Sequence, residues 1–131
     1  MNPQTYNFLL VDDNSATNFL NKMVIEKSGL ANKITIAQNG LEALNSVKAS
    51  APDFIFLDIN MPVMTGWEFL EAHEKLSQKK STIVLMISEK LNKETIAMSR
   101  SRYELVEYND KILNKSILNN LINSNLVNLA R

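Results

Sequence analysis

The feature that most constrains the fold of this chain is an apolar run that ends on a carboxylate. The residues from Phe54 to Leu57 are all large and apolar, and Asp58 follows them directly. An uninterrupted apolar run of this length is typical of a parallel strand that is covered on both faces. Asp58 is therefore expected where the strand ends, at the edge where open α/β sheets bind ligands. Pro62 and Gly66 then indicate a loop.

Two further apolar runs end on polar groups in the same way. The first strand is expected over 6–11, and its apolar run, residues 8–11, is followed by Asp12 and Asp13. Residues 82–87 are followed by Ser88. Because parallel strands present their carboxyl ends at one edge of the sheet, we expect these polar side chains to form a site there.

Helical patterns alternate with these strands. Residues 14 and 15, an asparagine and a serine, are candidate N-caps for a helix that is expected to end at Gly29. Short strands are expected over 33–37 and 105–108, the latter at a sheet edge, and a weak helix is expected over 94–100. The apolar positions of the first helix, which are expected to face the core, are Ala16, Phe19, Leu20, Met23 and Val24. The last helix has an apolar stripe formed by Ile117, Leu118, Leu121, Ile122, Leu126 and Leu129.

The helix after the third strand has a clear start signal. Thr65 and Glu68 have the spacing of a capping box. In and beside this helix, Met64 and Trp67 are expected to be packing residues and His73 is expected at the surface.

The order of elements predicts the architecture. Strand and helix alternate five times, which indicates a parallel sheet with helices on both faces and right-handed crossovers. The 131 residues are expected to form a single domain over 1–131.

Composition excludes several classes of protein. The chain has no cysteine, which rules out disulfides and thiolate metal sites. Its formal net charge is zero, so charge gives no reason to expect direct nucleic-acid binding. No apolar run approaches the roughly 20 residues of a membrane span. Residues 1–5 do not resemble a signal peptide. We therefore expect a cytoplasmic protein without membrane insertion.

The polar groups at the sheet edge suggest phosphoryl chemistry. Asp12, Asp13 and Asp58 would repel one another if they converged, so they need a cationic partner. Mg²⁺ prefers oxygen ligands and shares them with phosphate. Lys111, after the expected fifth strand, would supply an ammonium group, and Ser88 a hydroxyl. Carboxylates can form aspartyl phosphates, and the metal and the lysine would neutralise the charge of a phosphoryl group on Asp58.

Each of these residues also has a plain structural interpretation. Asp12 and Asp13 could be favoured by the dipole of the following helix. Asp58 could be a turn residue, Ser88 a helix cap, and Lys111 a solvated surface residue. Their occurrence at consecutive strand ends favours a shared site.

Several motifs in this chain occur together in one known family. They are Leu10-Val11-Asp12-Asp13-Asn14, Leu57-Asp58-Ile59-Asn60-Met61-Pro62 with Gly66, Ser88 thirty residues after Asp58, and Tyr108 three before Lys111. From residue 6 to about residue 126 the chain resembles the receiver domains of two-component response regulators. This resemblance implies a flavodoxin-like (βα)5 fold, a doubly wound parallel five-stranded sheet with strand order 2-1-3-4-5.

The resemblance also assigns roles to the site residues. It implies that Asp58 is the phosphoacceptor and that Asp12, Asp13 and Asp58 hold Mg²⁺, to which Asn60 contributes its backbone carbonyl. It implies that Lys111 bridges to the phosphoryl group.

A switch and its partners follow from the same resemblance. Ser88 would hydrogen-bond the phosphoryl group, and Tyr108 would turn inward as Ser88 moves. The phosphoryl group would come from a phosphohistidine on a histidine kinase or a histidine phosphotransfer protein. With no output domain expected after residue 111, the chain would signal by contact with an unspecified downstream protein. It would catalyse only its own phosphorylation and dephosphorylation.

Two positions depart from the family pattern. Ile112 stands where the family usually has a proline after a cis bond. Because a non-proline cis bond costs about 2.5–4 kcal/mol, we predict a trans bond between Lys111 and Ile112. Glu89 replaces a residue that is usually small and is expected to hinder donors or attacking water. These departures leave open an alternative, a receiver-fold interaction module that works without phosphorylation.

Two enzyme or ligand-binding classes fit less well. Aspartyl-phosphate phosphatases need Asp-x-Asp after the first strand, whereas this chain has Asp12-Asp13-Asn14. Flavin and nucleotide binders need phosphate-cradling loops. The glycines of this chain, at positions 29, 40 and 66, lie in no such loop.

Overall fold

The computed structural model describes residues 5–59, 61, 63–76, 81–86, 105–108 and 112–129, with the backbone alone for 105–108 and 124–129. The strands within these residues are β1 (Tyr6–Val11), β2 (Ala31–Ala37), β3 (Phe54–Asp58), β4 (Thr82–Met86) and β5 (Leu105–Tyr108). The helices are α1 (Ser15–Ser28), α2 (Gly40–Ala49), α3 (Gly66–Glu74) and α5 (Lys115–Leu129). The helix expected over 94–100 lies outside the described residues.

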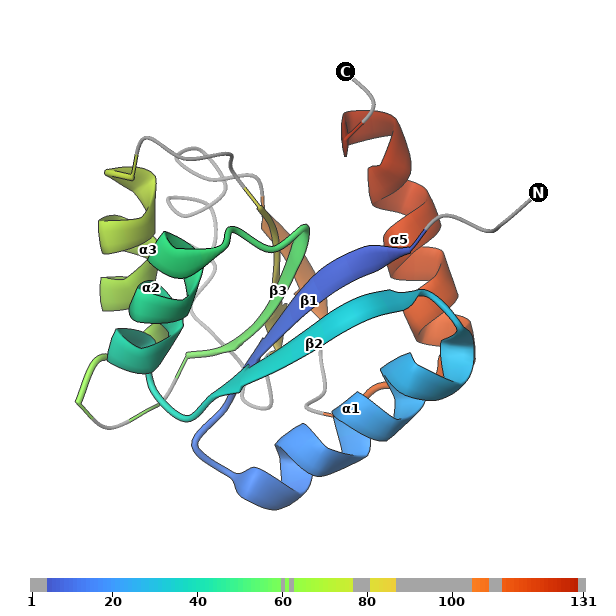
Figure 1. The fold of residues 1–131 in the computed structure, drawn as a ribbon, viewed down its shortest axis with the longest axis horizontal. Helices are drawn as coiled ribbons and strands as arrows, with labels where there is room; N and C mark the ends of the chain where they lie inside the picture. Colours follow the sequence, from blue (N-terminus) through green and yellow to red (C-terminus); the bar gives the residue numbers. More distant parts are fainter. Residues whose placement is uncertain are drawn as a thin grey trace.

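The strands form one parallel sheet in the order β2-β1-β3-β4-β5 (Figure 1). This is the predicted strand order, and β5 lies at an edge as expected. β2 begins two residues earlier than predicted, at Ala31. The register pairs Val11 of β1 with Leu57 of β3, so Asp12, just after β1, lies beside Asp58, the last residue of β3.

Helices cover both faces of the sheet, with α2 and α3 on one face and α1 and α5 on the other (Figure 1). Alternate residues of β3 pack into two different hydrophobic cores, one on each face of the sheet. Ile55 and Leu57 join the cluster under α2 and α3, whereas Phe54 and Phe56 join the cluster under α1 and α5. All four side chains are at least 98% buried. The prediction that this strand is covered on both faces is therefore confirmed.

The orientation of α1 agrees only in part with the prediction, because Val24 packs against the core as expected but other residues of the predicted stripe do not. Phe19 and Leu20 belong to its predicted core-facing stripe, yet they are 60% and 44% exposed. The residues that α1 buries are Thr17, Asn18, Asn21 and Ile25. One reason is that the side-chain amide of Asn18 donates a hydrogen bond of 2.8 Å to the carbonyl oxygen of Asp12. A buried amide with such a partner keeps the hydrogen bonding that an apolar environment would otherwise remove.

Another buried amide joins α1 to the start of α5. The Oδ1 atom of Asn21 accepts a 2.8 Å hydrogen bond from the backbone N–H of Leu113, a residue 92 positions away in the sequence. In α5, Leu118 and Ile122 are buried as its stripe predicted. At the ends of α1, Asn14 is the N-cap and the C-cap lies at residue 29, as expected.

α3 confirms its predicted capping box and corrects the prediction for His73. Thr65 and Glu68 satisfy each other's backbone N–H groups as the sequence indicated. His73, expected at the surface, is 4% exposed and its ring centroid lies 5.6 Å from that of Phe69. Because His73 is four residues after Phe69, both point from the same helical face into the core. Met64 and Trp67 pack against the core as predicted.

None of the helices in the described ranges has the length and apolar character that crossing a bilayer requires.

Candidate metal centre at the carboxyl edge of the sheet

Three carboxylates meet at the carboxyl edge of the sheet. Asp58 is the last residue of β3, and Asp12 and Asp13 directly follow β1. One oxygen from each of Asp12, Asp13 and Asp58 lies within 4.8 Å of those of the other two. The convergence follows from the parallel register, which brings the ends of two neighbouring strands to the same level.

The carboxylates differ in exposure. Asp12 and Asp58 are 5% and 2% exposed, whereas Asp13 is open to solvent. The backbone around Asp12 is held firmly, since its N–H donates to the carbonyl of Ala37 at 3.1 Å. Its Oδ1 atom accepts a 2.8 Å hydrogen bond from the backbone N–H of Asn14. The site therefore combines two buried acidic groups with one that faces water.

Asn18 supports this site and was not singled out from the sequence. Its side-chain amide donates to the carbonyl oxygen of Asp12 from the buried face of α1. An available signal was the occurrence of a poor helix former among apolar residues of a predicted helix. Asn18 touches the backbone of Asp12 and leaves the carboxylate available for the site.

The donor set fits a small, hard cation. Carboxylate oxygens are ligands that Mg²⁺ prefers, and Mg²⁺ commonly binds one or two protein carboxylates while keeping several waters. Ligands on opposite sides of one Mg²⁺ lie about 4.2 Å apart, because each bond is about 2.1 Å long. With oxygens within 4.8 Å of one another, the set suits direct binding by some carboxylates and contact through water by others.

The segment that leaves Asp58 is anchored by the start of α3. The N–H of Gly66 donates a 2.8 Å hydrogen bond to the carbonyl of Ile59. A Cβ atom at Gly66 would lie only 2.6 Å from the carbonyl oxygen of Asp58. Residue 66 must therefore be a glycine for α3 to begin this close to Asp58.

The structure describes the remaining predicted site residues only in part. Met86 of β4 pairs with Asp58 on one side and with Tyr108 of β5 on the other, so three strand ends lie at one level. Of Tyr108, only the backbone is described. Four residues lie outside the described ranges: Asn60, Ser88, Glu89 and Lys111. The predicted trans bond between Lys111 and Ile112 lies outside them too.

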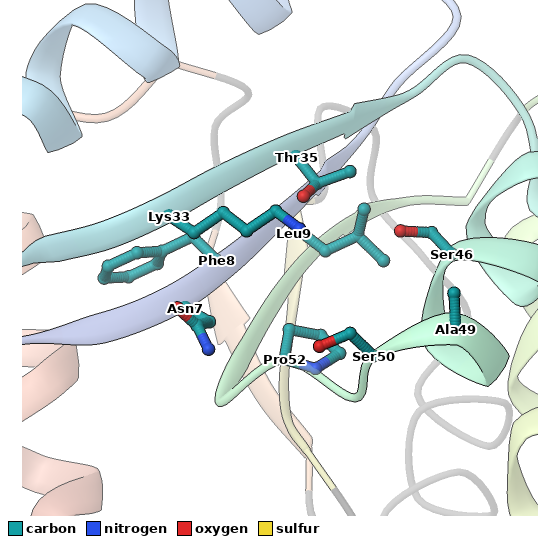
Figure 2. Close-up of a pocket in the computed structure, with 9 residues that line it drawn as sticks. All are labelled: Asn7, Phe8, Leu9, Lys33, Thr35, Ser46, Ala49, Ser50 and Pro52. Carbon is teal, nitrogen blue, oxygen red and sulfur yellow. The ribbon is translucent and has the colours of Figure 1, made fainter.

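A separate cavity of about 90 Å³ lies at the other end of the strands, between β2 and the end of α2 (Figure 2). Figure 2 shows the polar side chains of Thr35 and Ser46 beside it, from β2 and α2 respectively. This volume corresponds to a few water molecules and is well below the roughly 300 Å³ of small-molecule sites. The cavity is therefore not a candidate for the main functional site.

Comparison with known proteins gives a consistent set of relatives. The family profile described as response regulator receiver domain matches residues 8–123. Among solved structures, a two-component response regulator from Cytophaga hutchinsonii is 30% identical, with a TM-score of 0.80 over 95% of this chain and 98% of its own. The chemotaxis protein CheY4 of Vibrio cholerae is 26% identical, with a TM-score of 0.79 over 92% of this chain and 98% of its own.

Curated relatives match over a shorter region. Protein-glutamate methylesterase/protein-glutamine glutaminase 3 of Hahella chejuensis is 36% identical over 80 residues, which are 61% of this chain and 22% of that protein. An uncharacterised response regulatory protein of Vibrio cholerae is 37% identical over 86 residues, which are 65% of this chain and 32% of that protein. The matched region thus spans a third or less of these relatives.

Proposed function

Since this chain belongs to the response regulator receiver domain family, we propose that Asp58 accepts a phosphoryl group and that this modification changes the contacts of the protein with its partners. The observation that carries the proposal is the convergence of Asp12, Asp13 and Asp58 at the end of β3. Its setting supports the proposal, because ligands of open α/β sheets bind outside the carboxyl ends of the strands.

Asp58 is suited to act as the nucleophile. A carboxylate oxygen of Asp58 attacks the phosphorus of a phosphohistidine, the P–N bond breaks, and the leaving imidazole takes a proton from solvent. The product is an acyl phosphate on Asp58. Water then attacks the phosphorus, which releases inorganic phosphate and restores the carboxylate. The protein thereby returns to its starting state.

The neighbouring carboxylates suit a Mg²⁺ site. Asp12, Asp13 and Asp58 would hold the ion, and Asn60 would add its backbone carbonyl. When bound, Mg²⁺ supplies positive charge that neutralises the transferring phosphoryl group. The Asp12 carboxylate accepts a hydrogen bond from the backbone N–H of Asn14, so forming the site would need little reorganisation of this side chain.

We propose that the remaining predicted site residues form a conformational switch. Lys111 and Ser88 would contact the phosphoryl oxygens, and Tyr108 would respond to the movement of Ser88. A phosphoryl group adds charge and acceptor oxygens. The conformation in which Lys111 and Ser88 contact it therefore becomes more stable relative to the conformation in which they do not. The change is then read by a protein that binds the modified state.

The chain is proposed to work as a signalling module in the cytoplasm. Receiver domains in general are not metabolic enzymes, and here catalysis would be limited to the phosphoryl group on Asp58. Its upstream partner would carry a phosphohistidine, as histidine kinases and phosphotransfer proteins do. The methylesterase and glutaminase activities in the name of one relative are not proposed for this chain, since the match covers 22% of that protein.

The test is the intact mass of the protein after incubation with acetyl phosphate. We expect one phosphoryl adduct that requires Mg²⁺ and disappears in Asp58→Asn. The matched control is Asp53→Asn, because Asp53 also borders β3 but lies at its amino end. An adduct that survives in Asp58→Asn would contradict the assignment of the acceptor. No adduct in the unaltered protein would favour a receiver that binds partners without phosphorylation.

A further inference from the structure

The first residues of two helices donate hydrogen bonds to the segment that follows Asp58. α3 begins at Gly66, whose N–H donates to the carbonyl of Ile59 at 2.8 Å. α2 begins at Gly40, whose N–H donates to the carbonyl of Met64 at 3.2 Å. The segment from Ile59 to Met64 is therefore held at both ends by a backbone N–H of a glycine at a helix N-terminus.

The contact at Gly40 leaves no room for a side chain. A Cβ atom there would lie 2.7 Å from Cγ, 2.9 Å from Cβ and 2.9 Å from the carbonyl oxygen of Met64. Two of these atoms belong to the backbone or to the root of the side chain, so a rotamer change cannot relieve the clash. The backbone of Met64 would have to move.

Backbone conformation does not explain the glycine at position 40. Among the described glycines only Gly29 has a positive φ, at +76°, so Gly40 adopts a conformation that alanine also adopts. In the first turn of a helix, alanine would otherwise be favoured over glycine because it loses less conformational freedom on folding. The missing side chain at Gly40 therefore serves the close approach to Met64.

We infer that Gly40 is a positioning residue for the Asp58 site, because it lets α2 hold the segment that leaves Asp58. The inference rests on the proposed function. Met64 is two residues before Gly66, which itself packs against the carbonyl of Asp58. A displacement of Met64 is thus passed along a short, constrained path to the residue that accepts the phosphoryl group.

The test compares Gly40→Ala with Gly29→Ala. Gly29 lies at the C-cap of α1, and a Cβ there would meet nothing within 4 Å, so this control is strained by its positive φ alone. In Gly40→Ala we expect the rate of adduct formation from acetyl phosphate at saturating Mg²⁺ to fall about 10-fold, since a misplacement of about 1 Å can slow a reaction by about 100-fold. In Gly29→Ala we expect an unchanged rate with a lower denaturant midpoint.

Two readouts do not depend on the reaction. Calorimetric titration should show weaker Mg²⁺ binding in Gly40→Ala than in Gly29→Ala. In metal-free protein, the backbone amide resonances of Asp58 and Ile59 should shift in Gly40→Ala and stay in place in Gly29→Ala. If the unaltered protein forms no adduct, the proposed function fails, and these resonances still decide the inference about Gly40.

A double variant separates positioning from general damage. Adding Met64→Ala to Gly40→Ala removes the Cγ atom that makes the nearest contact, and should restore part of the rate and part of the resonance shift. Unchanged Asp58 and Ile59 resonances in Gly40→Ala, or a rate equal to that of Gly29→Ala, would overturn the inference. So would a loss of rate that merely follows the denaturant midpoint across the three variants.

Discussion

At the amino end of the sheet a single carboxylate ties two strands together, whereas at the carboxyl end three carboxylates face one another. Asp53, just before β3, accepts a 2.8 Å hydrogen bond from the backbone N–H of Asn7 at the start of β1. Its own N–H donates to the carbonyl of Asn7 at 2.9 Å, and its carbonyl accepts from Thr82 at 2.9 Å. At the other end, the oxygens of Asp12, Asp13 and Asp58 lie within 4.8 Å of one another.

The difference shows how residues of one type serve structure at one edge and function at the other. Asp53 uses its carboxylate to accept a hydrogen bond from the neighbouring strand, and this bond stabilises the fold. Asp12 and Asp58 are buried beside a third carboxylate, and the repulsion between these like charges costs stability that a bound cation would offset. Local departures of this kind from what stabilises a fold are expected at functional sites.

The largest expected effect is that of Mg²⁺ on stability. At a concentration 100-fold above its dissociation constant, Mg²⁺ should raise the free energy of unfolding by about 2.7 kcal/mol, because it binds the folded protein alone. Urea unfolding with Mg²⁺ and with EDTA measures this gain. Asp13→Asn should reduce the gain and should not destabilise the protein in EDTA, since it removes one of three clustered charges. An equal gain in this variant would contradict the site.

The next effect concerns the opposite edge. Asp53→Ala should lower the free energy of unfolding by about 1–2 kcal/mol, because the N–H of Asn7 loses its side-chain acceptor. The affinity for Mg²⁺, measured by calorimetry, should stay unchanged. A clear loss of affinity would show that the two edges are coupled and would weaken the contrast between them.

A smaller loss of stability is expected for Asn18, a polar residue that lies near the carboxylate site but stabilises the fold. Asn18→Ala should cost about 1 kcal/mol of stability, because the carbonyl of Asp12 loses a hydrogen bond. Since this bond does not involve the carboxylate, the Mg²⁺-dependent gain in stability should be nearly retained. Loss of most of that gain would mean that Asn18 aims the carboxylate of Asp12.

The smallest effect is expected on the exposed side of the same helix. Phe19→Ser should change the free energy of unfolding by no more than about 0.5 kcal/mol, because Phe19 is 60% exposed. Ile25→Val, on the buried face of α1, is the control and should cost about 1 kcal/mol. If thermal unfolding gave Phe19→Ser the larger loss, the described orientation of α1 would be wrong.

Much of the fold and part of the site could be predicted from sequence, because both depend on patterns that are local in the chain. The run from Phe54 to Leu57 is apolar on both faces, which only a doubly covered strand accommodates. Asp12 and Asp58 come directly after such runs, so strand ends and site residues were found together. The capping box of Thr65 and Glu68 needs residues three apart, and this too was predictable.

The orientation of α1 and the packing of His73 depended on tertiary structure. Helical periodicity sets the angles between side chains but not which face turns inward when polar residues have partners elsewhere. Asn21 is buried because its acceptor oxygen meets the N–H of a residue 92 positions away, and no local pattern indicates such a meeting.

The sequence by itself determined the order of elements, the doubly covered third strand and the carboxylates at its edge, because these follow from local hydrophobic patterns and the geometry of parallel sheets. Only the tertiary structure decided that α1 buries Asn21, which meets Leu113, in place of Phe19, and that Gly40 lies against Met64. Both depend on the distance between segments remote in sequence. That distance is set by the packing of whole helices on the sheet and is not encoded at any single position.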